Sequence, residues 1–124
     1  MNEYKKLSGP AANIIKYFSE NAGDYLVLFS LGNSAPCEVF KKCLPSIVED
    51  FDNQFSVVEV PLGGTKEEAH SLMDEMSVKF FPTLRLVQSG TIVADLKGGL
   101  QAEDHINYAR IYKWLLRFYN DKEE

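Results

Sequence analysis

Short apolar runs alternate with amphipathic stretches along this 124-residue chain. The run at 25–29 is almost entirely apolar, which is typical of a strand buried on both faces. The stretch at 55–60 is rich in β-branched residues, which favour strands. Ser89 and Gly90 separate two further apolar runs, and this spacing predicts a β-hairpin. The pattern as a whole predicts strands at residues 4–7, 25–29, 55–60, 83–88 and 91–96.

Apolar residues in the intervening segments recur every three or four positions, which is the period of an amphipathic helix. The first helix is expected to begin at Pro10 after a cap at Ser8. Thr65 and Glu68 form a potential capping box for the third helix, and Pro45 is expected to kink the second. The second helix is predicted at 36–51, the third through Leu72 and Met76, and the fourth at about 102–119. The fourth is expected to bury Ile106, Ile111, Trp114, Leu115 and Phe118.

The predicted order of elements is βαβαβαββα. Alternation at the front of the chain implies parallel strands joined by right-handed crossovers, and the final hairpin adds antiparallel strands. The fold class is therefore α/β, with a mixed central sheet of four to five strands flanked by four helices. We expect a single domain over residues 1–124, with a core at about 7–119 and a tail at 120–124.

This order, together with three short motifs, resembles the thioredoxin family. Phe29 ends a buried strand and is followed, four residues later, by Ser34-Ala35-Pro36-Cys37, where the family has Cys-x-x-Cys opening a long helix. Phe80-Phe81-Pro82-Thr83 resembles the family's Pro-Thr motif, whose proline follows a cis peptide bond. Gly98 matches the glycine that lines the third side of the family's groove. The resemblance implies the thioredoxin fold and a groove that binds extended peptide. The implied groove residues are Leu31, Gly32, Asn33, Ser34, Ala35, Pro36, Phe81, Pro82, Gly98 and Gly99.

The chain departs from the family at the position of the attacking cysteine, which is Ser34. A hydroxyl at a helix N-terminus is a good cap but forms no disulfide, and it is not appreciably ionised at neutral pH. Cys37 keeps the resolving position, where the resemblance implies a shielded thiol. Leu28 occupies the place of the family's buried acid. Glu59 would substitute if it pointed inward, although an outward-facing strand residue is the favoured interpretation.

Cys43 is a poor replacement for the missing thiol. Six residues of helix rise about 9 Å and rotate by roughly 240°, so Cys37 and Cys43 lie far apart on different faces. A disulfide requires Cα atoms within about 7 Å of one another. Cys43 is therefore expected to be a small apolar residue in or near the core.

The charge of the chain limits the classes of partner. The net charge is −5, which argues against nucleic acid or an anionic membrane as the main partner. Lys41 and Lys42 are expected on a solvated helix face. Two cysteines and two histidines offer no zinc-ligand spacing, and we expect no metal and no cofactor. No apolar run is long enough to insert in a membrane. The expected location is soluble, in the cytoplasm or, after removal of a signal peptide, the lumen of the endoplasmic reticulum.

The leading hypothesis is a redox-degenerate thioredoxin-like domain that binds extended polypeptide or a protein partner through the groove. Protein disulfide isomerase relatives with an altered Cys-x-x-Cys are similar to this. Two alternatives stay open, both of them thiol-disulfide oxidoreductases. In one, Cys37 acts alone, with glutathione or client proteins as partners. In the other, Ser34 replaces a native cysteine.

Overall fold

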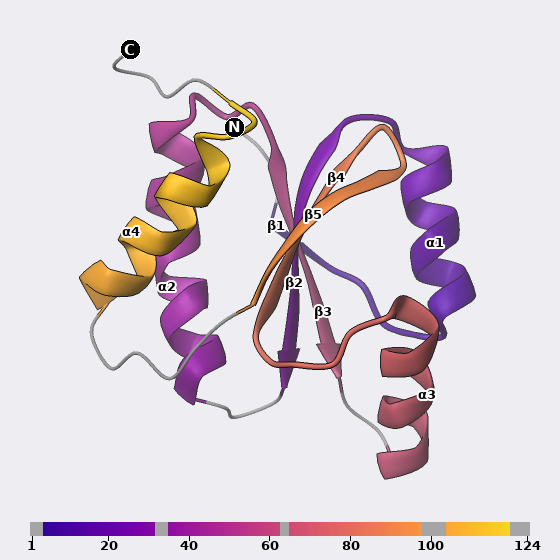
Figure 1. Ribbon diagram of the computed structural model, residues 1–124. Coiled ribbons are helices and arrows are strands. Elements are labelled where there is room, and N and C mark those ends of the chain that lie inside the picture. The colour runs from indigo at the N-terminus through magenta and orange to yellow at the C-terminus, as the bar shows by residue number, and fades with distance from the viewer. Residues whose placement is uncertain (1–3, 32–34, 63–64, 98–103, 120–124) are drawn as a thin grey trace.

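The computed structural model describes residues 4–31, 35–62, 65–97 and 104–119 (Figure 1). Five strands and four helices follow one another in the predicted order. They are β1 (Tyr4–Lys6), α1 (Ala11–Glu20), β2 (Asp24–Leu31), α2 (Ala35–Asp50), β3 (Ser56–Leu62), α3 (Lys66–Met76), β4 (Thr83–Gln88), β5 (Thr91–Lys97) and α4 (Asp104–Leu115).

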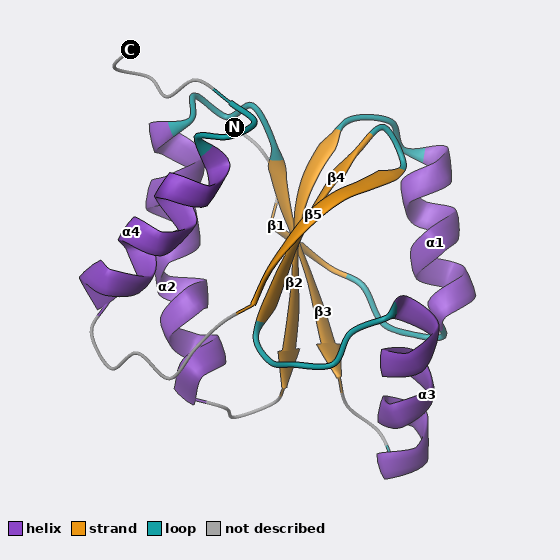
Figure 2. Cartoon of the chain, viewed as in Figure 1, coloured by secondary structure: helices purple, strands orange, loops and turns teal. Residues whose placement is uncertain are grey.

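The strands form one mixed sheet in the order β1-β3-β2-β4-β5. β3 pairs in parallel with β1 and β2, whereas β4 pairs antiparallel with β2 and β5. α2 and α4 cover one face of the sheet and α1 and α3 cover the other (Figure 2). The predicted fold class, a mixed sheet flanked by four helices, is confirmed.

The core has two parts because strand side chains alternate between the faces of the sheet. Leu26 and Leu28 of β2 point toward α2 and α4, where Phe40, Cys43 and Trp114 also pack. The neighbouring β2 residues Val27 and Phe29 lie in the second cluster, against α1 and α3. Cys43 is thus a core residue, as predicted.

Two helix boundaries differ from the predictions. α1 begins at Ala11, and its N-cap is Pro10, in extended backbone with no side-chain cap, so the predicted cap at Ser8 is wrong. α4 ends at Leu115, earlier than predicted. Ile106 is 36% exposed rather than buried. The buried stripe of α4 runs through Asn107 and Ile111, and Ile106 lies about 100° off that stripe.

The predicted capping box at the start of α3 is confirmed. Thr65 caps α3: its side chain accepts a hydrogen bond from the Glu68 N–H, while the Glu68 carboxylate accepts one from the Thr65 N–H. Pro45 lies inside α2, which continues as a single helix on both sides of it.

β5 forms one edge of the sheet. Its register against β4 shifts beside Leu86 and Val87, which pair with Ala94 and Ile92, so Val93 is an extra residue in a β-bulge. Ile92 and Val93 are both exposed at this edge.

Candidate functional site

The end of β2, the start of α2 and the segment leading into β4 lie at the same end of the sheet (Figure 1). These segments carry Leu31, Cys37 and Pro82. β2 ends at Leu31, and Cys37 lies in the first turn of α2. The Leu31 N–H donates a hydrogen bond to Cys37 Sγ at 3.3 Å. β4 runs antiparallel to β2, and the last pair of that ladder is Phe29 and Thr83, so Leu31 and Phe81 each lie two residues beyond it. The peptide bond between Phe81 and Pro82 is cis.

Some predicted groove residues lie outside the described residues. These are Gly32, Asn33, Ser34, Gly98 and Gly99, and the side chains of Ala35 and Pro36 are likewise not described.

The described part of this edge presents apolar side chains and open backbone. Leu31 is 44% exposed and Phe80 51% exposed, while Phe81 is half-buried and Pro82 is buried. The Thr83 hydroxyl donates to the Phe80 carbonyl at 2.7 Å and so fixes the turn into β4. Among the described residues, no other backbone group hydrogen-bonds to the N–H or C=O of Phe81. We call Leu31, Phe80, Phe81 and Pro82 the Pro82 surface.

Cys37 lies beneath this surface and has no solvent exposure. Cys37 and Cys43 are both thiols. A thiol reacts as its thiolate, which requires access to the reaction partner. An enclosed sulfur in the resolving position is therefore poorly placed to begin an exchange.

A buried polar cluster lies on the same face of the sheet as α2. Glu59 is only 2% exposed, so the interpretation of Glu59 as an outward-facing strand residue is wrong. Its carboxylate Oε2 accepts a hydrogen bond from the Ser30 hydroxyl at 2.8 Å and lies 3.2 Å from Lys41 Nζ. Lys41 also contacts Glu38 at 3.1 Å. Because a buried carboxylate needs such partners, the inward position of Glu59 depends on α2.

This cluster also changes the expected role of Lys41. The lysine bridges two carboxylates and is partly buried, so the prediction of a solvated helix face holds for Lys42 but not for Lys41. Hydrogen bonds to Glu38 and then to Glu59 raise the pKa of Lys41 and keep it cationic. Lys41 and Cys37 are four residues apart on α2 and hence share a helix face. The charge pair therefore lies on the same helix face as the thiol.

Arg85 holds the loop that leads to Pro82, a role that no sequence motif predicted. Its guanidinium binds Asp95 through Nε at 2.8 Å and Nη2 at 3.0 Å, and it lies over the ring of Phe29. The same group donates to the carbonyls of Met76, at 2.6 Å, and Ser77, at 3.3 Å. These carbonyls are at the end of α3, so Arg85 ties both ends of the loop at 77–82 together. The sequence feature that could have identified this role is a charged residue within the apolar run at 83–88.

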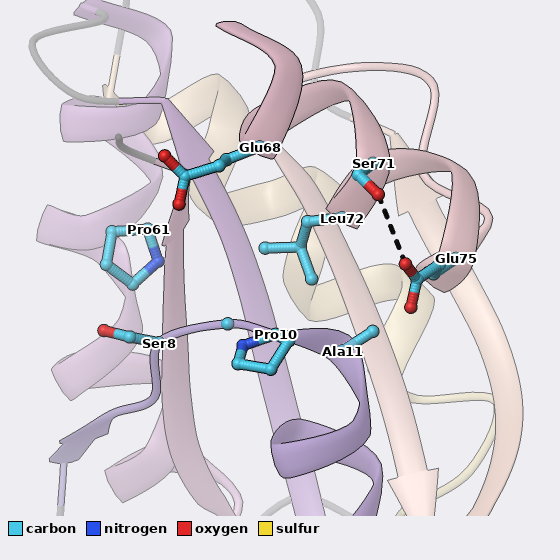
Figure 3. A pocket seen from close by; sticks show the side chains of 9 residues that line it. Ser8, Pro10, Ala11, Pro61, Glu68, Ser71, Leu72 and Glu75 are labelled. Atoms are coloured by element: carbon cyan, nitrogen blue, oxygen red, sulfur yellow. Dashed lines mark hydrogen bonds between the residues drawn. The ribbon is translucent and has the colours of Figure 1, made fainter. Parts of the chain in front are cut away.

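A cavity of about 510 Å³ lies elsewhere, between the segment leading into α1, the end of β3 and α3 (Figure 3). Leu72 and Pro61 contribute apolar surface, and Glu68 and Glu75 contribute carboxylates. The Ser71 hydroxyl donates to Glu75 at 3.2 Å (Figure 3). None of the predicted groove residues lines this cavity, so it is separate from the Pro82 surface.

Within the described ranges, no group of three or more His, Cys, Asp or Glu side chains is arranged to hold a metal ion. The helices in those ranges are also too short or too polar to cross a membrane.

The family model for thioredoxin matches residues 11–110. The chain therefore belongs to the thioredoxin family. None of the curated proteins matches the sequence.

Solved thioredoxins share the fold. Thioredoxin from Fasciola hepatica superposes with a TM-score of 0.67 at 17% identity, covering 93% of this chain and 98% of its own. Chloroplastic thioredoxin z superposes with a TM-score of 0.66 at 18% identity, covering 94% of this chain and 95% of its own. Thioredoxin f2 from Chlamydomonas reinhardtii superposes with a TM-score of 0.63 at 21% identity, covering 87% of this chain and 94% of its own. The sheet and its flanking helices are thus common to these proteins at low sequence identity.

Proposed function

We propose that this chain is a redox-degenerate thioredoxin-like domain that binds extended polypeptide through the predicted groove around Ser34–Cys37 and Pro82. The observation that carries the proposal is the pairing of Ser34, in the place of the attacking cysteine, with a Cys37 sulfur that has no solvent exposure. A dithiol exchange needs one thiolate to attack and a second thiol to release the substrate. The Ser34 hydroxyl cannot supply the attacking thiolate, and the enclosed Cys37 sulfur is poorly placed to take over that step.

The remaining surface suits binding. An extended peptide can pair with exposed backbone as an added strand, with its side chains alternating between two faces. The backbone of Phe81 is available for such pairing among the described residues. The exposed side chains of Leu31 and Phe80 offer apolar contact. Binding of this kind requires no chemistry from Cys37.

Peptide binding is tested by calorimetric titration of the full chain with an unstructured ten-residue peptide rich in Val, Thr and Ser. Leu31→Ser is expected to weaken binding about fivefold, because a half-exposed leucine contributes about 1 kcal/mol of apolar contact. Ile92→Ser is the matched control, since Ile92 is also an exposed large apolar residue but lies at the start of β5, far along the strand from Lys97. Absence of binding, or an equal loss in both variants, would overturn the proposal.

Redox degeneracy is tested by insulin reduction with dithiothreitol as the electron source. The wild-type chain is expected to give no rate above background, and Ser34→Cys is expected to give turnover because it restores both thiols. Turnover by the wild-type chain that disappears in Cys37→Ser would contradict degeneracy.

That outcome would instead support the second candidate function, in which Cys37 acts alone. The observations that favour it are the Leu31 N–H directed at Cys37 Sγ and the Lys41–Glu59 pair on the same face of α2. In this reaction the Cys37 thiolate attacks one sulfur of glutathione disulfide, forms a mixed disulfide and releases one glutathione thiolate. The rate of Cys37 alkylation, measured in a Cys43→Ser background, separates the two candidates: slow alkylation supports binding, and rapid alkylation supports a one-thiol enzyme.

A further inference from the structure

Phe80 and Lys97 form an exposed pair beside the Pro82 surface. Lys97 Nζ lies 4.8 Å from the centre of the Phe80 ring, within the range of a cation–π interaction. Lys97 is the partner of Thr83 in the β4–β5 ladder, and Thr83 directly follows Pro82. The ammonium group is thus held over the segment that precedes Pro82. Both side chains are exposed, so the pair presents one cation and one apolar ring to a bound chain.

The backbone that carries Lys97 is anchored on two sides. It is paired with β4, and Arg110 of α4 donates from Nη2 to the Lys97 carbonyl at 2.7 Å. A lysine on an anchored backbone loses less freedom on binding than one on a mobile loop. The structure therefore fixes the base of the Lys97 side chain next to the predicted groove.

The charge of Lys97 is not neutralised by a carboxylate in the described ranges. Within them the salt bridges of lysine involve Lys16 and Lys41, and Lys97 makes none. Lys79, the residue before Phe80, is also exposed and makes no salt bridge within those ranges. The chain as a whole carries a net charge of −5. A local excess of positive charge therefore lies beside Phe80 in a protein that is otherwise acidic.

We propose that Lys97 and Phe80 make the predicted groove selective for extended polypeptides that carry a carboxylate side chain beside an apolar one. This inference rests on the proposed function and specifies the substrate class of the same site. A carboxylate in the partner neutralises Lys97, and the neighbouring apolar side chain packs on the Phe80 ring. Because the rest of the protein repels acidic chains, the preference depends on this local cation.

The size of the preference follows from the exposure of the pair. Exposed ion pairs contribute modestly, so the acidic peptide is expected to bind about two- to fivefold more tightly than its neutral counterpart at low salt. Salt at 1 M shortens the Debye length to about 3 Å and is expected to remove most of this difference.

The test compares two ten-residue peptides that differ only in a central Glu or Gln, titrated into the full chain by calorimetry. The wild-type chain is expected to prefer the Glu peptide, and Lys97→Gln is expected to bind both peptides equally. Lys16→Gln is the matched control, because it removes the same charge from an exposed position on α1 and is expected to keep the preference. Unfolding midpoints of the variants confirm that they are folded.

The outcomes separate the two proposals. If the wild-type chain binds neither peptide, the proposed function fails and the preference fails with it. If it binds both equally, or if Lys97→Gln retains the preference, the inference about Lys97 is wrong while the binding function stands. If Lys16→Gln also loses the preference, overall charge rather than Lys97 sets it, and the inference is again overturned.

Discussion

Replacement of Arg85 is expected to destabilise the domain more than any other single change to a charged side chain that we consider. Arg85→Ala removes a guanidinium whose side chain is 4% exposed. It leaves Asp95 without its bidentate partner, and it leaves the Met76 and Ser77 carbonyls without their donor. Breaking a buried ion pair from one side costs about 3–5 kcal/mol. Because Asp95 is partly exposed and can regain water, we expect a loss near the lower end, about 3 kcal/mol.

A loss of that size is a large share of the stability of a domain, which is typically about 5–15 kcal/mol. It corresponds to a fall in Tm of roughly 10 °C for a chain of this length. Urea unfolding followed by the fluorescence of Trp114, the one tryptophan in the sequence, measures it directly. Arg85→Lys keeps the charge but cannot reproduce the forked contacts, so its loss is expected to be intermediate.

The matched control is Arg117→Ala, because Arg117 is exposed at the end of α4 and is expected to change stability by less than about 0.5 kcal/mol. If Arg85→Ala costs less than about 1 kcal/mol, the contacts of Arg85 do not hold the loop at 77–82, and the reasoning is refuted. Under the proposed function, the same variant is also expected to weaken peptide binding, because it releases both ends of that loop.

Three further predictions concern caps and pH. Thr65→Ala is expected to cost about 1 kcal/mol in urea unfolding by removing the cap of α3, and an unchanged midpoint would contradict the capping box. The hydrogen bond from the Thr65 N–H lowers the pKa of Glu68, so its stabilisation is present above pH 4.5 and lost as pH falls through the lowered value. The midpoint difference between wild type and Glu68→Gln should therefore shrink between pH 5 and 3; a constant difference would refute this. Burial and then the Asp24 hydrogen bond raise the pKa of Tyr119, so the folded state holds its proton and stability falls above pH 10. Tyr119→Phe should lose about 1–2 kcal/mol at pH 7 and show a smaller alkaline decline, and an unaltered alkaline profile would contradict the assignment.

The sequence was sufficient for the order of elements because local patterns encode them. The apolar run at 25–29 and the hairpin signal at Ser89-Gly90 depend only on neighbouring residues. The run lies in β2, and Ser89-Gly90 joins β4 to β5, as predicted. The family resemblance predicted that Cys37 and Pro82 lie at the same end of the sheet. Ile106 was misplaced because a one-residue error in the phase of a helix rotates a side chain by about 100°.

The polar contacts were not predictable in the same way, because each joins elements that are distant in the sequence. Glu59 turns inward because Ser30 of β2 and Lys41 of α2 supply its partners. Arg85 is buried because the end of α3 and Asp95 of β5 surround it. A pattern of apolar and polar positions cannot specify such partners, since it assigns a charged residue to the surface by default.

The bulge at Val93 has a consequence for how the domain behaves among copies of itself. An exposed edge strand is a template onto which another strand can add, and exposed apolar residues such as Ile92 increase that tendency. An extra residue breaks the regular spacing of hydrogen-bonding groups along the edge and twists it, so a neighbouring β5 cannot pair over its whole length. β1, the opposite edge, spans three residues in the part of the chain that the structure describes. Both edge strands are therefore poor templates for pairing with another copy of the chain, and the protein is expected not to aggregate through its sheet edges at high concentration.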